Sequence, residues 1–463
     1  MPARSRGTLR RRSSKDEETR SGGTTSRPSP EVVYEGRIYH RGRIISAEIG
    51  TDNNGIIVAV AKSLRGGERK SFGEAVLLPS AIDIHAHFRD PGPPGEVENL
   101  DSGTTQAALG GVGTAVDMPN TQPPTTTVER MREKIDRIHS HSWIDILPYA
   151  ALMQGSRVEN LAKVASGFKL YLAQTTGDLA ISPETEMGEL LARVCSTGLP
   201  LHVHAEDPLR FHGGPPPTNT EEWDHARPMD SEMSAIEKLA DHPTELKLHI
   251  AHATSVDALH RAIEIGACVE ATPHHLFLSA STFGGSLNKV NPPLRPESVR
   301  KALWEEFKKG SIPVLASDHA PHSLSKKSLP FSESPSGVPG IETMIPLMLE
   351  RVRLQDLSVS TFVNVTARHP ALFLGLNRGR LEKGCEANFI VVDFRKRKRI
   401  RTSELHAPCG WTPFEGWDAI FPEEHYLRGN RMVEGGEFVG GSKGMVVRPM
   451  QRRDQDSSSG LGN

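Results

Sequence analysis

The stretch Leu77–Gly92, LLPSAIDIHAHFRDPG, combines an apolar run with two histidines, an arginine and an aspartate. Side chains two residues apart in a β-strand point to the same face, so His85 and His87 should project together. They lie near the end of a strand that Pro91 and Gly92 would terminate. Two imidazoles beside a cation and a carboxylate can hold a metal ion and bind an anionic substrate. Taken alone, the pair also fits two hydrogen-bonded strand histidines.

The composition excludes several classes of protein. A chain of 463 residues can form one large barrel with a small added domain, or several ordinary domains. Its formal net charge of −2 creates no strong field for nucleic acid or a membrane. The 4 cysteines are scattered without a CxxC spacing, which argues against a disulfide framework or a thiolate zinc site. With no membrane-length apolar run and no signal peptide, we expect a cytoplasmic protein.

Both ends of the chain are predicted to be disordered tails. Residues 1–30 are rich in Arg, Ser and Gly, and bury too little apolar surface to offset the entropy of ordering. Residues 448–463 have a similar composition. A transit peptide is also rich in Arg and Ser, but Asp16, Glu17 and Glu18 argue against one. A nucleic-acid-binding arm is the alternative to a solvated tail, which we favour.

Short β segments separated by Gly and Asn turns fill residues 31–80, among them Val32–Tyr34 and Arg37–Tyr39. A matching set occupies residues 384–447, including Ala387–Asp393. Because the two β-rich ends flank a long middle, they can pair with each other. We therefore expect one small β-sandwich built from the N- and C-terminal segments.

Residues 81–383 alternate short apolar strands with helix-like segments. The predicted strands are Ile82–His87, Gly113–Met118, Ile144–Ala151, Phe168–Leu172, Leu199–Ala205, Leu246–Ala251, Ala267–Ala271 and Ile312–Ser317. Helices are predicted at Val128–Ser140, Glu184–Ser196, Met233–Asp241, Ser255–Ile265 and Pro296–Lys309, among others. Eight βα units in about 250 residues predict an α/β fold, a (β/α)₈ TIM-type barrel. A doubly wound sheet is the alternative, but no strand is followed by its Gly-rich phosphate fingerprint.

The active site of such a barrel lies at the C-terminal ends of the strands. These ends read HAHFRDPG, DMPNTQPP, FKLYLAQTTGD, HVHAED, HIAHATS, ATPHHLF and ASDHAPH. Metal-binding residue types recur at the ends of the first, fourth, fifth, sixth and eighth strands. A chance scatter of 20 histidines would not produce this regularity. The repetition therefore predicts a metal centre.

The position along each strand distinguishes candidate ligands from other histidines. His204 and His252 lie nearer the strand ends than His202 and His249, so we favour them as ligands. Asp318 closes the eighth strand, where its carboxylate can ligate a metal and accept a proton. A salt-bridged structural aspartate is the alternative. Seven other histidines are expected on helices or loops in solvent (His139, His141, His212, His225 and His260) or in a turn of structural or site function (His274 and His275).

Lys169, in the segment GFKLYL (167–172), stands out among these residues. An ammonium aimed at metal cations would be repelled, so an unmodified buried lysine is unfavourable there. A lysine carbamylated by CO₂ becomes an anionic ligand with two oxygens that can bridge two metals. A lysine that snorkels to solvent is the alternative. Among these neighbours, we favour the bridge.

Two further features suit substrate binding. Arg89, just beyond the histidine pair, can hold a carboxylate through its bidentate guanidinium. The small polar loop Ala173–Asp178 is placed to close over the site, where Thr175 and Thr176 can hydrogen-bond the substrate.

The order of the strand-end motifs resembles that of the dihydroorotases of the amidohydrolase superfamily, from about residue 32 to residue 445. The motifs are DIHAHFRDPG (83–92), DMPNTQPP (117–124), GFKLYL (167–172), HAED (204–207), AHATS (251–255), ATPHHLFLS (271–279), VNPPLR (290–295), ASDHAPH (316–322), GVPGIETMIPLML (337–349) and WTPFEG (411–416). The resemblance implies reversible interconversion of N-carbamoyl-L-aspartate and (S)-dihydroorotate in pyrimidine synthesis.

The resemblance also implies a two-zinc centre and assigns its ligands. His85, His87 and Asp318 would hold one ion and His204 and His252 the other, with N6-carboxylated Lys169 and a hydroxide as bridges. Asp318 would be the catalytic proton shuttle. The implied substrate-binding residues are Arg89, Asn120, Asn291 and His322, with the backbone of Pro339 and Gly340.

Two alternatives to this activity are weighed. Hydantoinases and allantoinases share the fold and metal centre but lack the arginine after the His-x-His pair and the final histidine of SDHAPH, which here are Arg89 and His322. A non-catalytic dihydroorotase-like partner of aspartate transcarbamoylase would lose metal ligands that this chain retains. The resemblance leaves open a homodimer and an aspartate transcarbamoylase partner. A nucleic-acid partner would depend on the basic tail alone.

Overall fold

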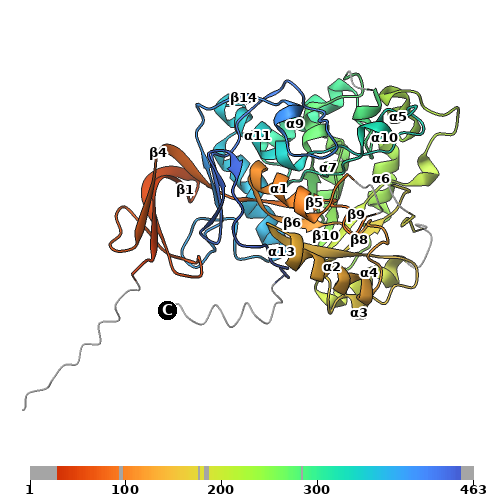
Figure 1. The fold of residues 1–463 in the computed structure, drawn as a ribbon. Helices are drawn as coiled ribbons and strands as arrows, with labels where there is room; N and C mark the ends of the chain where they lie inside the picture. The colour runs from red at the N-terminus through yellow and green to blue at the C-terminus, as the bar shows by residue number, and fades with distance from the viewer. Residues whose placement is uncertain (1–28, 93–96, 176–177, 182–186, 283–284, 450–463) are drawn as a thin grey trace, which may run out of the picture.

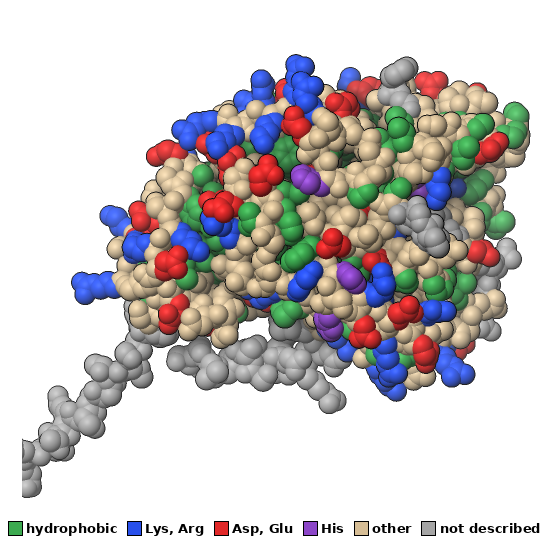
Figure 2. Space-filling model, viewed as in Figure 1, with side chains coloured by type: hydrophobic (Ala, Val, Ile, Leu, Met, Phe, Trp, Pro, Cys, Tyr) green, Lys and Arg blue, Asp and Glu red, His purple; other side chains and the backbone are tan. Residues whose placement is uncertain are grey.

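The computed structural model describes residues 29–92, 97–175, 178–181, 187–282 and 285–449. Apart from residues 29–30 and 448–449, the two expected tails lie outside the described residues. Figure 1 shows a strand-rich part formed by both ends of the chain beside a larger part in which helices surround a sheet. Lys and Arg side chains are interspersed with Asp and Glu side chains over the face drawn in Figure 2, in keeping with the net charge of −2.

The larger part is built on a parallel sheet of 8 strands in consecutive order. Its strands are β5 (Ala81–Ala86), β6 (Val112–Asp117), β7 (Asp145–Ala151), β8 (Gly167–Tyr171), β9 (Leu201–His204), β10 (Leu248–Ile250), β11 (Cys268–Ala271) and β12 (Val314–Leu315). The first strand meets the segment after the last one, because Ala86 forms a parallel bridge with His319. The backbone N–H of His87 also donates to the His319 carbonyl at 2.8 Å. The predicted (β/α)₈ architecture is confirmed.

Helices follow the strands around the barrel. They are α1 (Leu100–Gly110), α2 (Val128–His141), α3 (Val158–Leu161), α4 (Met187–Thr197), α5 (Thr220–Ala226), α6 (Met229–Glu237), α7 (Val256–Glu264), α8 (Pro273–Phe277), α9 (Glu297–Lys309), α10 (Leu324–Lys327), α11 (Ile341–Arg353), α12 (Val359–Val363) and α13 (His369–Leu374). Local signals set their ends: Ser255 caps α7 by accepting from the Ala258 N–H, and Gly310 ends α9 at φ +81°. The helix predicted from Glu184 begins among residues that the structure does not describe.

The second part is one sheet of 8 strands, ordered β18-β17-β16-β13-β4-β1-β2-β3. Their bounds are β1 (Val32–His40), β2 (Arg43–Thr51), β3 (Ile57–Ala61), β4 (Glu68–Pro79), β13 (Phe389–Val392), β16 (Glu424–Leu427), β17 (Asn430–Glu434) and β18 (Glu437–Phe438). The two ends of the chain pair as predicted, since β13 runs antiparallel to β4. A separate pair consists of β14 (Lys398–Arg399) and β15 (Asp418–Ala419).

One strand assignment in the N-terminal segment is wrong. Val32–Tyr34 and Arg37–Tyr39 belong to the single strand β1, and the predicted break at Gly36 is an irregularity in its pairing with β4. A glycine inside a strand often marks such a bulge. A Cβ at Gly36 would lie 3.0 Å from the Leu77 side chain, so the close approach of the two strands suits glycine.

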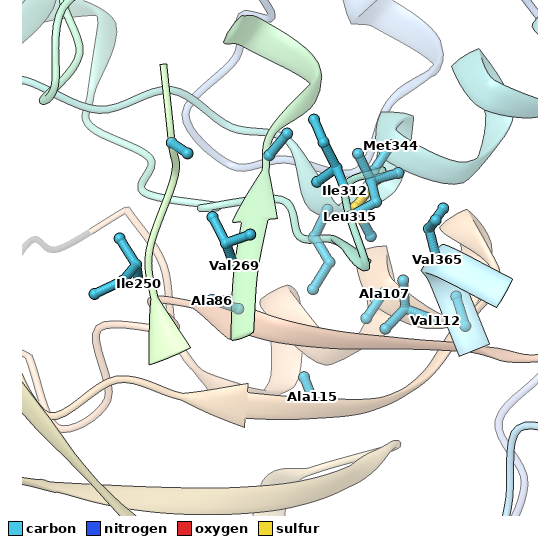
Figure 3. Packing of buried hydrophobic residues seen from close by; sticks show 14 of the residues in the cluster. Ala86, Ala107, Val112, Ala115, Ile250, Val269, Ile312, Leu315, Met344 and Val365 are labelled. Carbon is cyan, nitrogen blue, oxygen red and sulfur yellow. The ribbon is translucent and has the colours of Figure 1, made fainter. Parts of the chain in front are cut away.

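Close packing fixes the strand that carries the first histidine pair. The sheet formed by both ends encloses its own aromatic cluster, in which the Phe389 and Tyr426 rings stack with centroids 4.6 Å apart. Only Ser80 separates the end of its strand β4 from the start of β5. On the barrel side, apolar side chains from strands and helices interdigitate, among them Ile250, Val269, Leu315, Met344 and Val365 (Figure 3).

Within the described part of the chain, no helix has both the length and the apolarity to cross a membrane.

Candidate metal centre

His85, His87 and Asp318 form a cluster at the C-terminal ends of the first and last strands. One ligand atom from each lies within 4.8 Å of the others. The Nε2 atoms of His85 and His87 are 3.4 Å and 3.2 Å from Oδ1 of Asp318. The two residues predicted from the i, i+2 spacing therefore do share a face, and the closure of the barrel brings Asp318 to them.

The hydrogen bonds of the two imidazoles indicate which ring nitrogen carries the hydrogen. Nδ1 of His85 lies 2.5 Å from Oε1 of Glu270, and Nδ1 of His87 lies 2.5 Å from Oδ1 of Asn120. Because these oxygens accept, each Nδ1 carries the hydrogen and each Nε2 keeps a lone pair. Burial lowers the pKa of both histidines, which favours the neutral rings.

Two lone pairs therefore lie close to a carboxylate oxygen of Asp318, an arrangement that a metal cation between them would stabilise. The donor set of two imidazoles and one carboxylate suits zinc and similar transition metals. The residues present thus fit a metal ion at this position.

His204 and His252 form a second pair, with Nδ1 of His204 2.9 Å from Nε2 of His252. Glu206 orients His204 through a 2.7 Å contact to Nε2 and is itself bonded by Arg227 at 3.0 Å. Burial raises the pKa of Glu206, but Arg227 and His204 outweigh it and keep the pKa below its usual range. Within the described residues, the buried Nδ1 of His252 has no hydrogen-bond partner. This pair fits a metal as well.

Lys169 lies beside the first cluster, on β8. Its Nζ is 3.3 Å from Nε2 of His85, and the side chain is almost wholly buried. Burial lowers the pKa of Lys169 to about 8, against the opposing effect of Glu270 and Asp318. Snorkelling to solvent is excluded, because the amine points into the site rather than out of the barrel.

One cavity contains all six predicted ligands and several predicted substrate contacts. Besides the ligands, it is lined by Arg89, Asn120, Tyr171, Thr175, Asn291, Ala320, Ser336 and Gly337. Three predicted substrate contacts among the described residues, His322, Pro339 and Gly340, are absent from this lining. Nε2 of His322 bonds the Ser336 carbonyl at 3.0 Å, and the Gly340 N–H donates to Nδ1 of His319 at 3.1 Å, next to Pro339. Thr176 lies outside the described residues.

The amide of Asn291 is oriented by its neighbours. Its Oδ1 accepts from Nε1 of Trp223 at 3.2 Å and from Oγ of Ser336 at 3.1 Å. With the oxygen held by two donors, the NH₂ group is the part left to face the cavity that Asn291 lines. Asn291 therefore offers a donor to an anionic or carbonyl oxygen.

Backbone conformation turns three of these side chains into the site. Arg89, His252 and Asp318 have φ values of 56°, 40° and 44°, in the left-handed region that residues other than glycine seldom adopt. Each follows the end of a barrel strand. Such strained positions concentrate at active sites, where the surrounding packing over-determines them.

Glu270, which orients histidines of the site, was not predicted from the sequence. Its carboxylate contacts His85, Nε2 of His249 at 2.9 Å and the His252 N–H at 3.1 Å. An acidic residue in an otherwise apolar strand was the signal available, because a charge buried in a strand requires partners. Glu206 in the segment HAED carried a similar signal.

The five histidines predicted to lie in solvent do so, whereas His274 and His275, predicted in a turn, belong to helix α8. His139, His141, His212, His225 and His260 are exposed. His275 belongs to α8 and engages both ring nitrogens, with Oγ1 of Thr272 at 2.8 Å and the Pro292 carbonyl at 3.0 Å. Those contacts favour the structural alternative for His275.

Comparison with known proteins agrees with this site. Residues 76–418 match the model of the amidohydrolase family. A dihydroorotase of Halobacterium salinarum is 36% identical over 381 residues, covering 80% of this chain and 89% of the relative. A dihydroorotase of Methanosarcina acetivorans is 35% identical, covering 89% and 96%.

Solved structures agree on the fold. The L-hydantoinase (dihydropyrimidinase) of Arthrobacter aurescens superposes with a TM-score of 0.82 at 24% identity, covering 90% of this chain and 99% of its own. At that identity, the likeness concerns the fold alone. The family match and the extent of the curated relatives are sufficient for assignment: the chain belongs to the amidohydrolase family and, within it, to the dihydroorotases.

Proposed function

We propose that this enzyme interconverts N-carbamoyl-L-aspartate and (S)-dihydroorotate, a reaction of pyrimidine synthesis. The observation that carries the proposal is the position of Arg89, which lines the same cavity as the six metal-ligand candidates. Its guanidinium can pair with the substrate carboxylate through two parallel hydrogen bonds. A hydantoin or allantoin ring has no carboxylate to match it, which disfavours the alternative activity.

We further propose that two zinc ions occupy the site. His85, His87 and Asp318 would hold one ion and His204 and His252 the other, and N6-carboxylated Lys169 would supply further ligand oxygens. Bound metal supplies an activated water and polarises the amide carbonyl. The pKa of about 8 supports carboxylation of Lys169, because only the neutral amine reacts with CO₂ and burial enlarges its fraction.

The remaining steps fall to side chains of the cavity. Arg89 and the NH₂ group of Asn291 would bind and orient the substrate, and Asp318 would move a proton through its carboxylate to the departing ring nitrogen. Thr175 lines the cavity and, with Thr176, would cover the bound substrate. His322, Pro339 and Gly340 remain predicted contacts.

The direct test is turnover of L-dihydroorotate by metal-loaded protein, followed in the ultraviolet, with hydantoin and allantoin as comparison substrates. Turnover of dihydroorotate well above that of the other rings is expected. Preferred turnover of hydantoin would support the hydantoinase alternative. Absence of turnover of all three, with metal bound, would support a non-catalytic partner of aspartate transcarbamoylase.

A further inference from the structure

Two buried lysines lie behind one wall of the cavity. This wall is formed by residues 328–338, here called the wall loop, which contributes Ser336 and Gly337 to the lining. Lys289 and Lys327 lie beneath it with only 4% and 1% of their surfaces exposed. Lysine is almost never this deeply buried without a charged partner, so both side chains require an explanation.

Both ammonium groups bind backbone carbonyls of the wall loop. Nζ of Lys289 donates to Phe331 at 2.6 Å, to Ser334 at 2.8 Å and to Ser332 at 3.3 Å. Nζ of Lys327 donates to Pro335 at 3.0 Å and to Gly337 at 3.1 Å, and its third bond reaches the Lys289 carbonyl at 3.2 Å. The Gly337 N–H returns a bond to that same carbonyl at 2.9 Å. Together, these bonds tie the loop on both sides of Ser336.

Ser336 connects the wall loop to two predicted substrate-binding residues. Its carbonyl bonds Nε2 of His322 at 3.0 Å, and its hydroxyl donates to Oδ1 of Asn291 at 3.1 Å. The second of these bonds helps to turn the NH₂ group of Asn291 toward the cavity. A wall loop that moved by even an ångström would therefore misplace a predicted substrate donor.

The two charges are not neutralised by carboxylates. Among the described residues, the partners of both ammonium groups are backbone carbonyls, and no carboxylate contributes to the pKa shift of either lysine. Aromatic faces lie near instead: Nζ of Lys289 is 4.7 Å from the Trp223 ring centroid, and Nζ of Lys327 is 5.5 Å from that of Trp411. Burial lowers the pKa of Lys289 to about 8 and that of Lys327 to about 7. A nearby anion favours the charged form of a lysine, so an anionic occupant of the cavity would stabilise both ammonium groups.

We propose that Lys289 and Lys327 are positioning residues for the anionic substrate. They hold the wall loop so that Ser336 and Asn291 are correctly placed, and their charge adds to that of Arg89. The substrate part of this inference rests on the proposed dihydroorotase function, whereas the loop part does not.

The test replaces each lysine by methionine, which keeps an unbranched chain but removes the charge and the donors. Lys326→Met is the matched control, because Lys326 precedes Lys327 and is exposed. In Lys327→Met and Lys289→Met, we expect KM for L-dihydroorotate to rise about tenfold or more, with kcat changed by less than about threefold and metal content unchanged. The control should match the unmutated enzyme.

A second readout does not depend on turnover. In the substrate-free protein, amide hydrogen exchange of residues 331–337 should accelerate in both methionine variants and not in Lys326→Met. Unchanged exchange in both would overturn the inference, and accelerated exchange with an unchanged KM would overturn its substrate part. An unmutated enzyme without turnover would instead refute the proposed function and leave the loop readout valid. If one methionine variant does not fold, the same measurements are made on the other.

Discussion

Oε1 of Glu270 lies 2.5 Å from Nδ1 of His85, although 185 positions separate the two residues in the sequence. The same carboxylate bonds the His252 N–H at 3.1 Å, so it contacts one residue from each predicted ligand pair. Partners of this kind fix the tautomer and orientation of a metal-binding imidazole. A single buried carboxylate thus joins the two predicted ligand pairs beneath the candidate site.

Glu270→Gln should weaken metal binding while the barrel still folds. Glutamine has one acceptor oxygen instead of two, so it cannot accept from both His85 and His249, and one ring loses its orientation. Loss of such a partner typically lowers metal affinity by about 10- to 100-fold. Metal affinity would be measured by competition with a chelator, with circular dichroism as the control for folding. An unchanged affinity would contradict the orienting role of Glu270.

Lys169→Ala should lose most of the bound metal and most of the activity. The removed group lines the cavity, so the fold should persist. Acetate can place two oxygens in the vacated space and should restore part of the rate. The measurements are the metal content and the activity with and without acetate. Normal metal content and normal turnover in the mutant would remove Lys169 from the mechanism.

Asp318→Asn should abolish activity in both directions. The amide retains an oxygen that can ligate a metal, but it cannot accept and release a proton. Hydrolysis needs the carboxylate and cyclisation starts from its protonated form, so the unmutated enzyme should show opposite pH limbs for the two directions. Rates in both directions across the pH range check this. Parallel profiles would count against Asp318 as the proton shuttle.

Arg89→Met should preserve the metal content and severely reduce kcat/KM for dihydroorotate. Removing one member of a buried charge pair typically costs about 2–5 kcal/mol, because the substrate carboxylate is left unpaired. Metal analysis and steady-state kinetics on the same sample separate the two effects. An unchanged kcat/KM would reopen the hydantoinase alternative.

His406 should make a small pH-dependent contribution to stability. Its Nδ1 lies 2.8 Å from Oε1 of Glu342, and this carboxylate raises the pKa of His406. A raised folded-state pKa gives stabilisation that is complete below the unfolded value of about 6.5 and is lost as pH rises through the folded pKa. Because the ring is partly exposed, the contribution should stay below about 1 kcal/mol.

The expected result is a larger difference in Tm between the unmutated protein and His406→Gln at about pH 5.5 than at about pH 8.5. Glu342→Gln should remove the same pH-dependent part. A difference in Tm that grew with pH would show that the pair does not act in this way.

Much of the architecture could be predicted because it depends on local sequence patterns. The two-residue period of a strand placed His85 and His87 on one face. Eight short apolar segments alternating with helical segments in the middle of the chain predicted the barrel. Helix α11 lacks such a pattern because residues 341–350 are buried on all sides, so no polar face creates a period of 3.6. The break predicted at Gly36 was wrong because the pairing of β1 with β4 overrides a local turn signal.

Local sequence pattern was sufficient to identify residue types suited to a metal on the predicted strands or just after them, and therefore the candidate ligands His85, His87, Lys169, His204, His252 and Asp318. Only the tertiary structure decided which partners complete them: Glu270 beneath the histidines, and Lys289 and Lys327 behind the wall loop. The physical reason is the range of each signal. Strand periodicity and strand ends act between neighbours in the chain, whereas hydrogen bonds to a buried charge join residues that only the closed barrel brings together.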